Sequence, residues 1–177
     1  MSISLLFTVL VWFSMVTNVK QGIPFSDASI FEYFGYAMNR GELMYADLFD
    51  HKGPVVFLLN YLGYLIGGAS GIKFLYLFCT FLFFIASYKI SRLFTGNKQT
   101  ILTLAIIFII YEYFFDGGWS LEGFILPFLS YSLYIFLKLF IQNDFSKNDI
   151  VVSGAFFAIV FFTKANMIGI WLVFCIN

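Results

Sequence analysis

The hydrophobic positions of this 177-residue chain form long apolar runs that are separated by short polar stretches. A helix that crosses a bilayer needs about 20 predominantly apolar residues, so these runs predict membrane spans. No lysine or arginine precedes the first run, and no small-residue cleavage pattern follows it, so we expect it to remain as an anchor. The predicted spans cover residues 3–18, 71–94, 100–115, 122–141, 150–163 and 166–177.

Residues 54–67 are apolar but short for a span, and they allow two topologies. If this stretch crosses the membrane, the basic residues at the ends of later spans face outside. If it lies along the surface, they face the cytoplasm, as the positive-inside rule prefers. We favour the surface arrangement, which also puts Asp116 and Glu122 on the same side as Asp27 and Asp50. The basic residues concerned are Lys89, Arg92, Lys98, Lys138 and Lys147.

The polar stretch after the first run predicts another helix that lies on the membrane. Ser26 is a good N-cap, and apolar residues recur at helical spacing from Ile30 to Met38. Gly41 suits a left-handed helix cap, and Pro54 suits the first position of the next helix. We therefore expect interfacial helices at residues 27–40 and 54–67.

Composition supports a membrane protein, since 61% of the residues are hydrophobic and 11% are charged. Soluble domains are about one quarter charged. The formal net charge is zero, so no basic face for nucleic acid is indicated. The expected fold is an all-α, polytopic transmembrane helical bundle in a cell membrane, with both interfacial helices in the first external loop. It forms one domain, residues 1–177, which we expect to be the N-terminal part of a longer protein because the last run stops soon after it begins.

The first external loop carries the side chains that are suited to chemistry. Asp27 begins a helix, whose positive dipole end stabilises a carboxylate able to accept a proton. Asp50, His51 and Lys52 combine an acceptor, an imidazole and a fixed cation. Lys52 can neutralise a phosphate, and Asp50 and His51 can bind a divalent ion. The alternative is a solvated loop in which Asp50 and Lys52 balance each other.

Three further ionisable residues lie near the ends of later runs. Asp116 and Glu122 flank a Gly-Gly turn, where they either close a cavity over the first loop or sit among lipid headgroups. Lys164 interrupts the last apolar stretch, where a charge is costly unless it faces a wet site or reaches the interface.

The order of these segments resembles bacterial membrane glycosyltransferases of the GT-C type. It is similar to the family 39-like group, which is related to protein O-mannosyltransferases and lipid A aminoarabinose transferases. The first-loop motif runs through residues 40–54, with Gly53 where many members have proline. The family often has two adjacent acids in an earlier motif, where this chain has one, at Ser26-Asp27. Residues 117–128 look like the second acidic turn of that family, and residues 162–164 look like its lysine-bearing span end.

The resemblance implies transfer of a sugar from a polyprenyl-phosphate donor to an acceptor on the outer face of the membrane. It makes Asp27 and Asp50 the candidate catalytic residues, with Asp27 as the general base or the residue that orients the acceptor. Lys52 would contact the donor phosphate, and Asp50 and His51 would shape that site, with or without a metal. A second carboxylate would come from Asp116 or Glu122, and Lys164 would join the substrate-binding residues. The implied partners are the lipid-linked sugar and membrane lipid.

Two other functions remain open at this point. A transporter or flippase fragment would place its acids along a path through the membrane, and a truncated membrane protein would have no catalytic activity. The sequence leaves the sugar, the acceptor, the oligomeric state and the use of a divalent metal ion undecided.

Overall fold

The computed structural model describes residues 2–19, 27–115, 120–144 and 146–176. Within these ranges the chain is all-helical, as expected, and contains no strand. Its elements are α1 (Ser2–Val19), α2 (Asp27–Asn39), α3 (Pro54–Phe94), α4 (Asn97–Phe115), α5 (Leu121–Gln142), α6 (Lys147–Phe161), the short 3-10 helix η1 (Ala165–Met167) and α7 (Gly169–Ile176).

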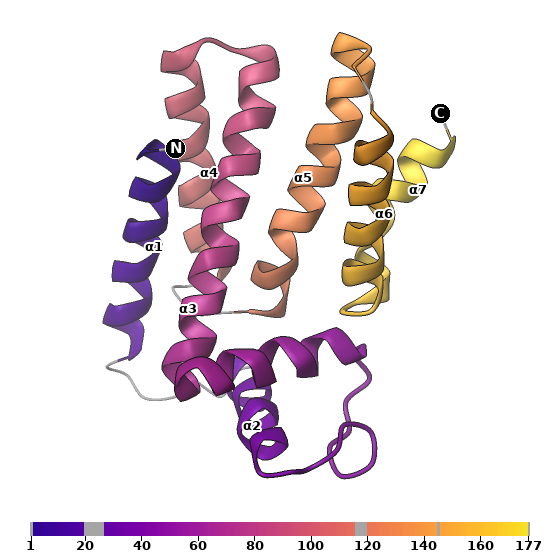
Figure 1. Ribbon diagram of the computed structural model, residues 1–177. Helices are drawn as coiled ribbons and strands as arrows, with labels where there is room; N and C mark the ends of the chain where they lie inside the picture. Colours follow the sequence, from indigo (N-terminus) through magenta and orange to yellow (C-terminus); the bar gives the residue numbers. More distant parts are fainter. Residues whose placement is uncertain (1, 20–26, 116–119, 145, 177) are drawn as a thin grey trace.

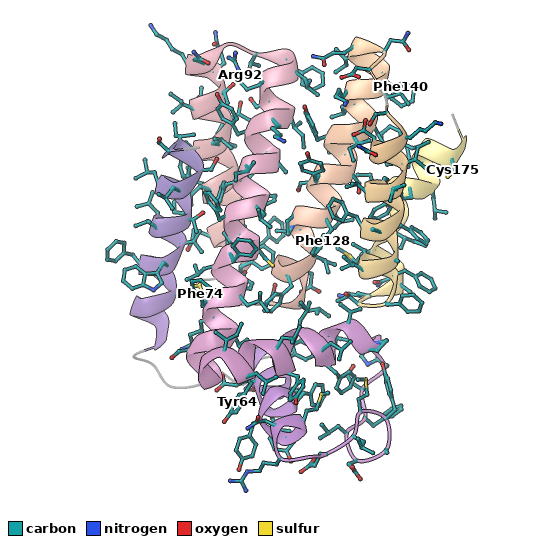
Figure 2. All side chains as sticks on the ribbon, viewed as in Figure 1. Tyr64, Phe74, Arg92, Phe128, Phe140 and Cys175 are labelled. Carbon is teal, nitrogen blue, oxygen red and sulfur yellow. The ribbon has the colours of Figure 1, made fainter. Side chains whose placement is uncertain are left out.

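The helices form a bundle whose members alternate in direction (Figure 1). The C-terminal end of α3 and the N-terminal end of α4 meet at one end of this bundle, and α2 lies beyond the opposite end. Figure 2 shows Arg92 at the first of these ends and Tyr64 at the second. Helix α3 is the central element, because it contacts α1, α2, α4 and α5.

A sharp bend divides α3 into a short arm, residues 54–66, and a long arm, residues 69–94. Gly67 and Gly68 have non-helical backbone angles, and Gly68 has a φ of 61° that side chains strongly disfavour. The short arm lies across the end of the bundle, whereas the long arm runs along it (Figure 1). Two packed glycines hold the arms together, because a Cβ added to Gly71 would lie 2.1 Å from the Gly63 carbonyl oxygen.

Helix α2 covers the short arm through an apolar interface. Phe31, Phe34 and Ala37 from α2 are buried against Val56 and Phe57 of the short arm. The rings of Phe34 and Phe57 stack with their centroids 4.5 Å apart. The expectation of helices at 27–40 and from Pro54 is therefore confirmed as local structure, with α2 ending one residue earlier.

Gly41 ends α2 in the way its position predicts. Its φ is 95°, so it adopts the left-handed conformation. The Glu42 N–H donates to the Ala37 carbonyl at 3.2 Å, and the Gly41 N–H donates to the Met38 carbonyl at 3.0 Å. These two bonds form a Schellman motif, which satisfies carbonyls at the helix end and starts the first loop. The predicted Ser26 cap lies outside the described residues.

A buried tyrosine network joins α3, α4 and the start of α5. The Tyr76 and Tyr111 hydroxyls lie 2.5 Å apart, and Thr80 lies 3.2 Å from Tyr111. Gly123 leaves room for Tyr76, since a Cβ there would lie 2.3 Å from its ring. This close contact fixes the first turn of α5, which carries Glu122, against the long arm of α3.

Three helices, α3, α4 and α5, are long and apolar enough to cross a membrane. The described apolar part of α1, Ser2–Met15, is shorter. Helices α6 and α7 contain 15 and 8 residues, fewer than the about 20 that a bilayer needs. The spans expected at 150–163 and 166–177 therefore stay predictions.

We expect Gly71→Ala to lower the stability of the bundle. The added methyl group has no space beside the Gly63 carbonyl, and such overpacking costs about 1–3 kcal/mol. The midpoint of thermal denaturation in detergent micelles should fall. Gly154→Ala is the matched control, because Gly154 is helical and nothing lies within 4 Å of its added Cβ. An equal midpoint for both variants would contradict close packing at the bend.

Candidate functional site

The first loop, residues 42–52, is a folded structure held by its own hydrogen bonds. The Leu43 N–H donates to an Asp47 carboxylate oxygen at 2.9 Å. The Tyr45 N–H donates to the Leu48 carbonyl at 2.6 Å, and Tyr45 has a positive φ of 63°. Leu48 is buried in the cluster with Phe31 and anchors the loop on α2.

The Tyr45 side chain connects the loop to the residues that follow it. Its hydroxyl donates to the Lys52 carbonyl at 2.7 Å. Partial burial raises the pKa of the Tyr45 phenol, and the nearby Asp50 carboxylate raises it further. Tyr45 therefore stays protonated at neutral pH and acts as a donor that fixes the backbone of Lys52.

Asp50 organises both of the residues that follow it. One of its carboxylate oxygens accepts the Lys52 N–H at 2.9 Å. The same oxygen lies 3.3 Å from His51 Nδ1 and 3.5 Å from Lys52 Nζ. The Lys52 side chain is 10% exposed and its ammonium lies 4.8 Å from the centroid of the Phe31 ring. A shielded ammonium needs compensating charge, which Asp50 and the aromatic face supply.

Gly53 brings the first loop against the chain segment after α6. The Gly53 N–H donates to the Thr163 carbonyl at 3.2 Å, and the Val55 N–H donates to the Phe162 carbonyl at 3.1 Å. A Cβ on Gly53 would lie 1.9 Å from the Phe162 carbonyl oxygen. Glycine alone has a free backbone N–H and no Cβ, so it can make this hydrogen bond without a clash. Proline would add a side chain and remove the N–H. The departure from the proline-bearing pattern therefore has a structural reason in this chain.

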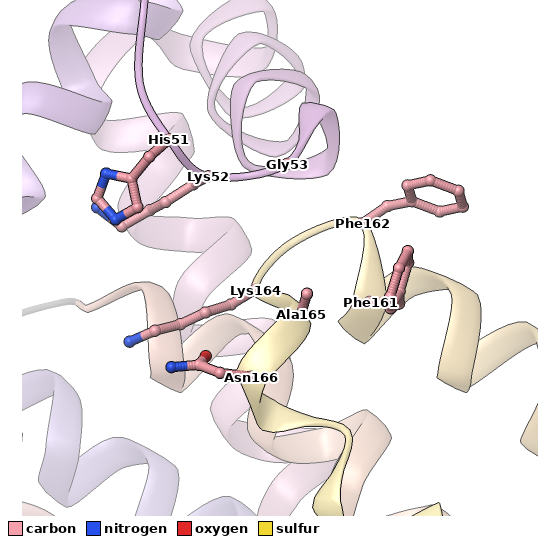
Figure 3. A pocket seen from close by; sticks show the side chains of 8 residues that line it. All are labelled: His51, Lys52, Gly53, Phe161, Phe162, Lys164, Ala165 and Asn166. Carbon is pink, nitrogen blue, oxygen red and sulfur yellow. The ribbon is translucent and has the colours of Figure 1, made fainter.

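This contact creates a cavity of about 400 Å³ between the loop and η1. Figure 3 shows four polar side chains pointing to the same side, while Phe161 and Phe162 point the other way. The polar side chains are those of His51, Lys52, Lys164 and Asn166.

Lys164 reaches from this cavity to the start of α5. Its Nζ lies 2.5 Å from Glu122 Oε1, and the two side chains are 29% and 35% exposed. The backbone of Lys164 is extended, so the chain leaves α6 and presents the side chain before η1 begins. Ser120 caps α5 by accepting the Gly123 N–H at 3.1 Å, which sets the orientation of the first turn around Glu122.

Glu122 lines a second, apolar cavity of about 490 Å³. The ion pair therefore links a residue of the polar cavity, Lys164, to a residue of the apolar cavity, Glu122. Besides Glu122 and Tyr111, apolar side chains line the second cavity: Phe83, Ile107, Ile110, Phe114, Phe115, Leu126 and Met167.

The structure brings together five of the seven residues singled out from the sequence: Asp50, His51, Lys52, Glu122 and Lys164. Asp27 is the first residue of α2, and its side chain is not part of the described structure. Asp116 lies outside the described residues. Asn166 also lines the polar cavity but was not among the predicted residues. Its polar side chain within an apolar stretch is the sequence feature that could have identified it. The carbonyls of Phe162 and Thr163 gave no sequence signal.

The described residues offer a poor fit to a metal ion. No group of three or more His, Cys, Asp or Glu side chains gathers in the described ranges. Asp50 and His51 supply two ligands, fewer than the three or four protein ligands of typical zinc sites.

A protein-family comparison matches the whole chain, residues 1–177, to the family described as "Putative competence-induced protein Ccs4 N-terminal domain". The chain belongs to this family. Comparison with curated proteins and with solved structures gave no match. The family description names a domain and no reaction, so the similarity to membrane glycosyltransferases stays a prediction.

We expect Gly53→Ala to separate the first loop from the segment after α6. Its methyl group would overlap the Phe162 carbonyl, so the variant should lose at least about 1–3 kcal/mol of stability. Thermal denaturation in detergent provides the measurement. Gly169→Ala serves as the control, because no atom lies within 4 Å of its added Cβ. Wild-type stability in Gly53→Ala would exclude the close approach.

Proposed function

We propose that this chain is a multi-pass protein of the bacterial plasma membrane that transfers a sugar from a polyprenyl-phosphate donor to an acceptor at the outer surface. The observation that carries the proposal is the meeting of two lysines from distant segments. Lys52 and Lys164 line one polar cavity, and the ion-pair partner of Lys164, Glu122, lines an apolar cavity. A lipid phosphate has the same two parts, an anionic head and a hydrocarbon chain.

The arrangement of the helices supports the topology. The short arm of α3 lies across the bundle end that carries the first loop, as an interfacial helix would, and α2 lies beyond it (Figure 1). Arg92 lies at the opposite end, where α3 and α4 meet (Figure 2). Positive residues prefer the cytoplasmic side, so the first loop and the polar cavity face outward.

The lysines suit the leaving group of a sugar transfer. When the acceptor oxygen attacks the anomeric carbon, the bond from that carbon to the phosphate oxygen breaks and leaves its electron pair on the phosphate. Lys52 and Lys164 stabilise this charge, and a partly shielded site strengthens the effect. The proton of the attacking hydroxyl goes to a carboxylate, for which Asp27 at the start of α2 is the candidate.

Asp50 has a positioning role in this proposal. Its carboxylate receives the Lys52 N–H and lies beside His51 and the Lys52 ammonium. These contacts hold Lys52 toward the cavity. Asp50 remains within the predicted catalytic set, and its contribution is to orient the cation that meets the donor.

The topology can be tested by cysteine labelling in intact cells. We expect a membrane-impermeant reagent to label Asp50→Cys and Gly118→Cys, because both positions face outward. Lys98→Cys, near the start of α4, should react only after the cells are opened. The native residues Cys79 and Cys175 are first replaced by alanine. Opposite accessibility of positions 50 and 118 would overturn the topology.

Catalysis can be tested by measuring sugar transfer in membranes that contain the chain with any coding sequence that follows residue 177. Asp27→Asn should lower transfer at least about 100-fold, because general base catalysis contributes factors of that size. Lys52→Gln should lower it to a similar extent by leaving the phosphate charge unbalanced. Lys147→Gln, at the far end of the bundle, is the control and should retain wild-type transfer. Proton-coupled solute uptake without transfer would favour a transporter.

A further inference from the structure

The Glu122–Lys164 ion pair occupies the place where a phosphate would meet Lys164. Lys164 lines the polar cavity, yet its ammonium is 2.5 Å from a carboxylate that belongs to the protein. A bound anion and Glu122 therefore compete for the same ammonium. Lys52 has a different carboxylate partner, Asp50, and the Asp50 oxygen that lies near the Lys52 ammonium also accepts the Lys52 backbone N–H.

The two ion pairs differ in how firmly they are held. Asp50 belongs to the same short loop as Lys52, and the Lys52 N–H reinforces the pair. Glu122 and Lys164 come from different elements, and both side chains are about one third exposed. Partly exposed pairs contribute little net stability. Glu122–Lys164 is the shorter contact, 2.5 Å against 3.5 Å, but its greater exposure lets water replace it at small cost, while the Lys52 N–H holds the Asp50 carboxylate within the loop.

The backbone around Lys164 restricts the exchange to side chains. The Thr163 and Phe162 carbonyls accept hydrogen bonds from Gly53 and Val55, so this segment is fixed to the short arm of α3. Ser120 and the Tyr76–Gly123 contact fix the first turn of α5. Only the long side chains of Glu122 and Lys164 are left to move.

We propose that Glu122 is a built-in competitor that holds Lys164 when the cavity is empty and yields it to the phosphate of an incoming lipid. The exchange transfers the ammonium from carboxylate to phosphate and leaves the Glu122 carboxylate beside the apolar cavity. Glu122 thus raises the concentration of anion needed to fill the site, and it discriminates against weakly charged ligands. This inference rests on the proposed function, because it assigns a regulator to the same phosphate site.

Binding of farnesyl phosphate to the purified full chain in detergent tests the competition by isothermal titration calorimetry. Inorganic phosphate and farnesol are run in parallel to separate the phosphate head from the hydrocarbon chain. Glu122→Gln keeps the side-chain shape and removes the competing charge. Loss of a partly exposed ion pair should then tighten farnesyl phosphate binding by about two- to fivefold. Lys164→Gln should weaken it at least about tenfold, the factor that 1.4 kcal/mol represents.

Asp144→Asn is the matched control, because Asp144 pairs with Lys138 at 3.3 Å at the distant α5–α6 turn. It should leave affinity unchanged. Glu122→Asp retains the charge but shortens the side chain, so it should tighten binding less than Glu122→Gln does. This second variant keeps the test decisive if the amide variant does not fold.

Weaker binding in both Glu122 variants, with Lys164→Gln also weakened, would overturn the competitor role and leave the phosphate site intact. Absence of farnesyl phosphate binding to the wild type would instead remove the proposed function itself. Equal affinity for farnesyl phosphate and farnesol would show that the hydrocarbon alone is recognised, which also excludes the competition. If inorganic phosphate bound tightly and farnesyl phosphate did not, and Glu122→Gln tightened phosphate binding by the same factor, the competitor role of Glu122 would stand. The ligand would then be a free anion and not a lipid phosphate.

Discussion

The close approach of Gly53 to the Phe162 carbonyl is the constraint on which the site depends. Two backbone hydrogen bonds, from Gly53 and Val55, join segments that lie more than a hundred residues apart in the chain. Backbone contacts of this kind are independent of side-chain rotamers, so they place the first loop accurately. Lys52 and Lys164 are the neighbours of these bonded residues, and they face one cavity because their backbones are joined.

The charged side chains of the site are arranged in pairs. A membrane protein tolerates ionisable groups where they are paired or reach water. Here each lysine of the site has a carboxylate within reach, Asp50 for Lys52 and Glu122 for Lys164. The charges of these two pairs therefore sum to zero. A site of this kind can bind an anion only by rearranging its own pairs.

The sequence predicted much of the local structure because its signals were local. Gly41 and Pro54 marked helix boundaries through backbone preferences, and the structure has both where they were expected. The Asp50-His51-Lys52 triplet was visible as a group. The pairing of Lys164 with Glu122 was not, because it depends on how α5 packs against the segment after α6. Nor did any pattern announce that carbonyls at positions 162 and 163 would receive the first loop. Helix α6 ends at Phe161, two residues before the predicted end of its run, and η1 and α7 share the stretch predicted as one span at 166–177, since the chain extends at Lys164.

The bend in α3 has a geometric consequence for the depth of the site. At 1.5 Å per residue, a straight helix of 41 residues would be about 60 Å long, twice the hydrocarbon thickness of a bilayer. The turn at Gly67 and Gly68 divides this length without a linker. Because Gly71 packs against Gly63, the short arm is held at a fixed angle to the long arm. The two glycines of the bend thus determine where the start of the short arm, and with it Lys52, lies relative to the end of the bundle.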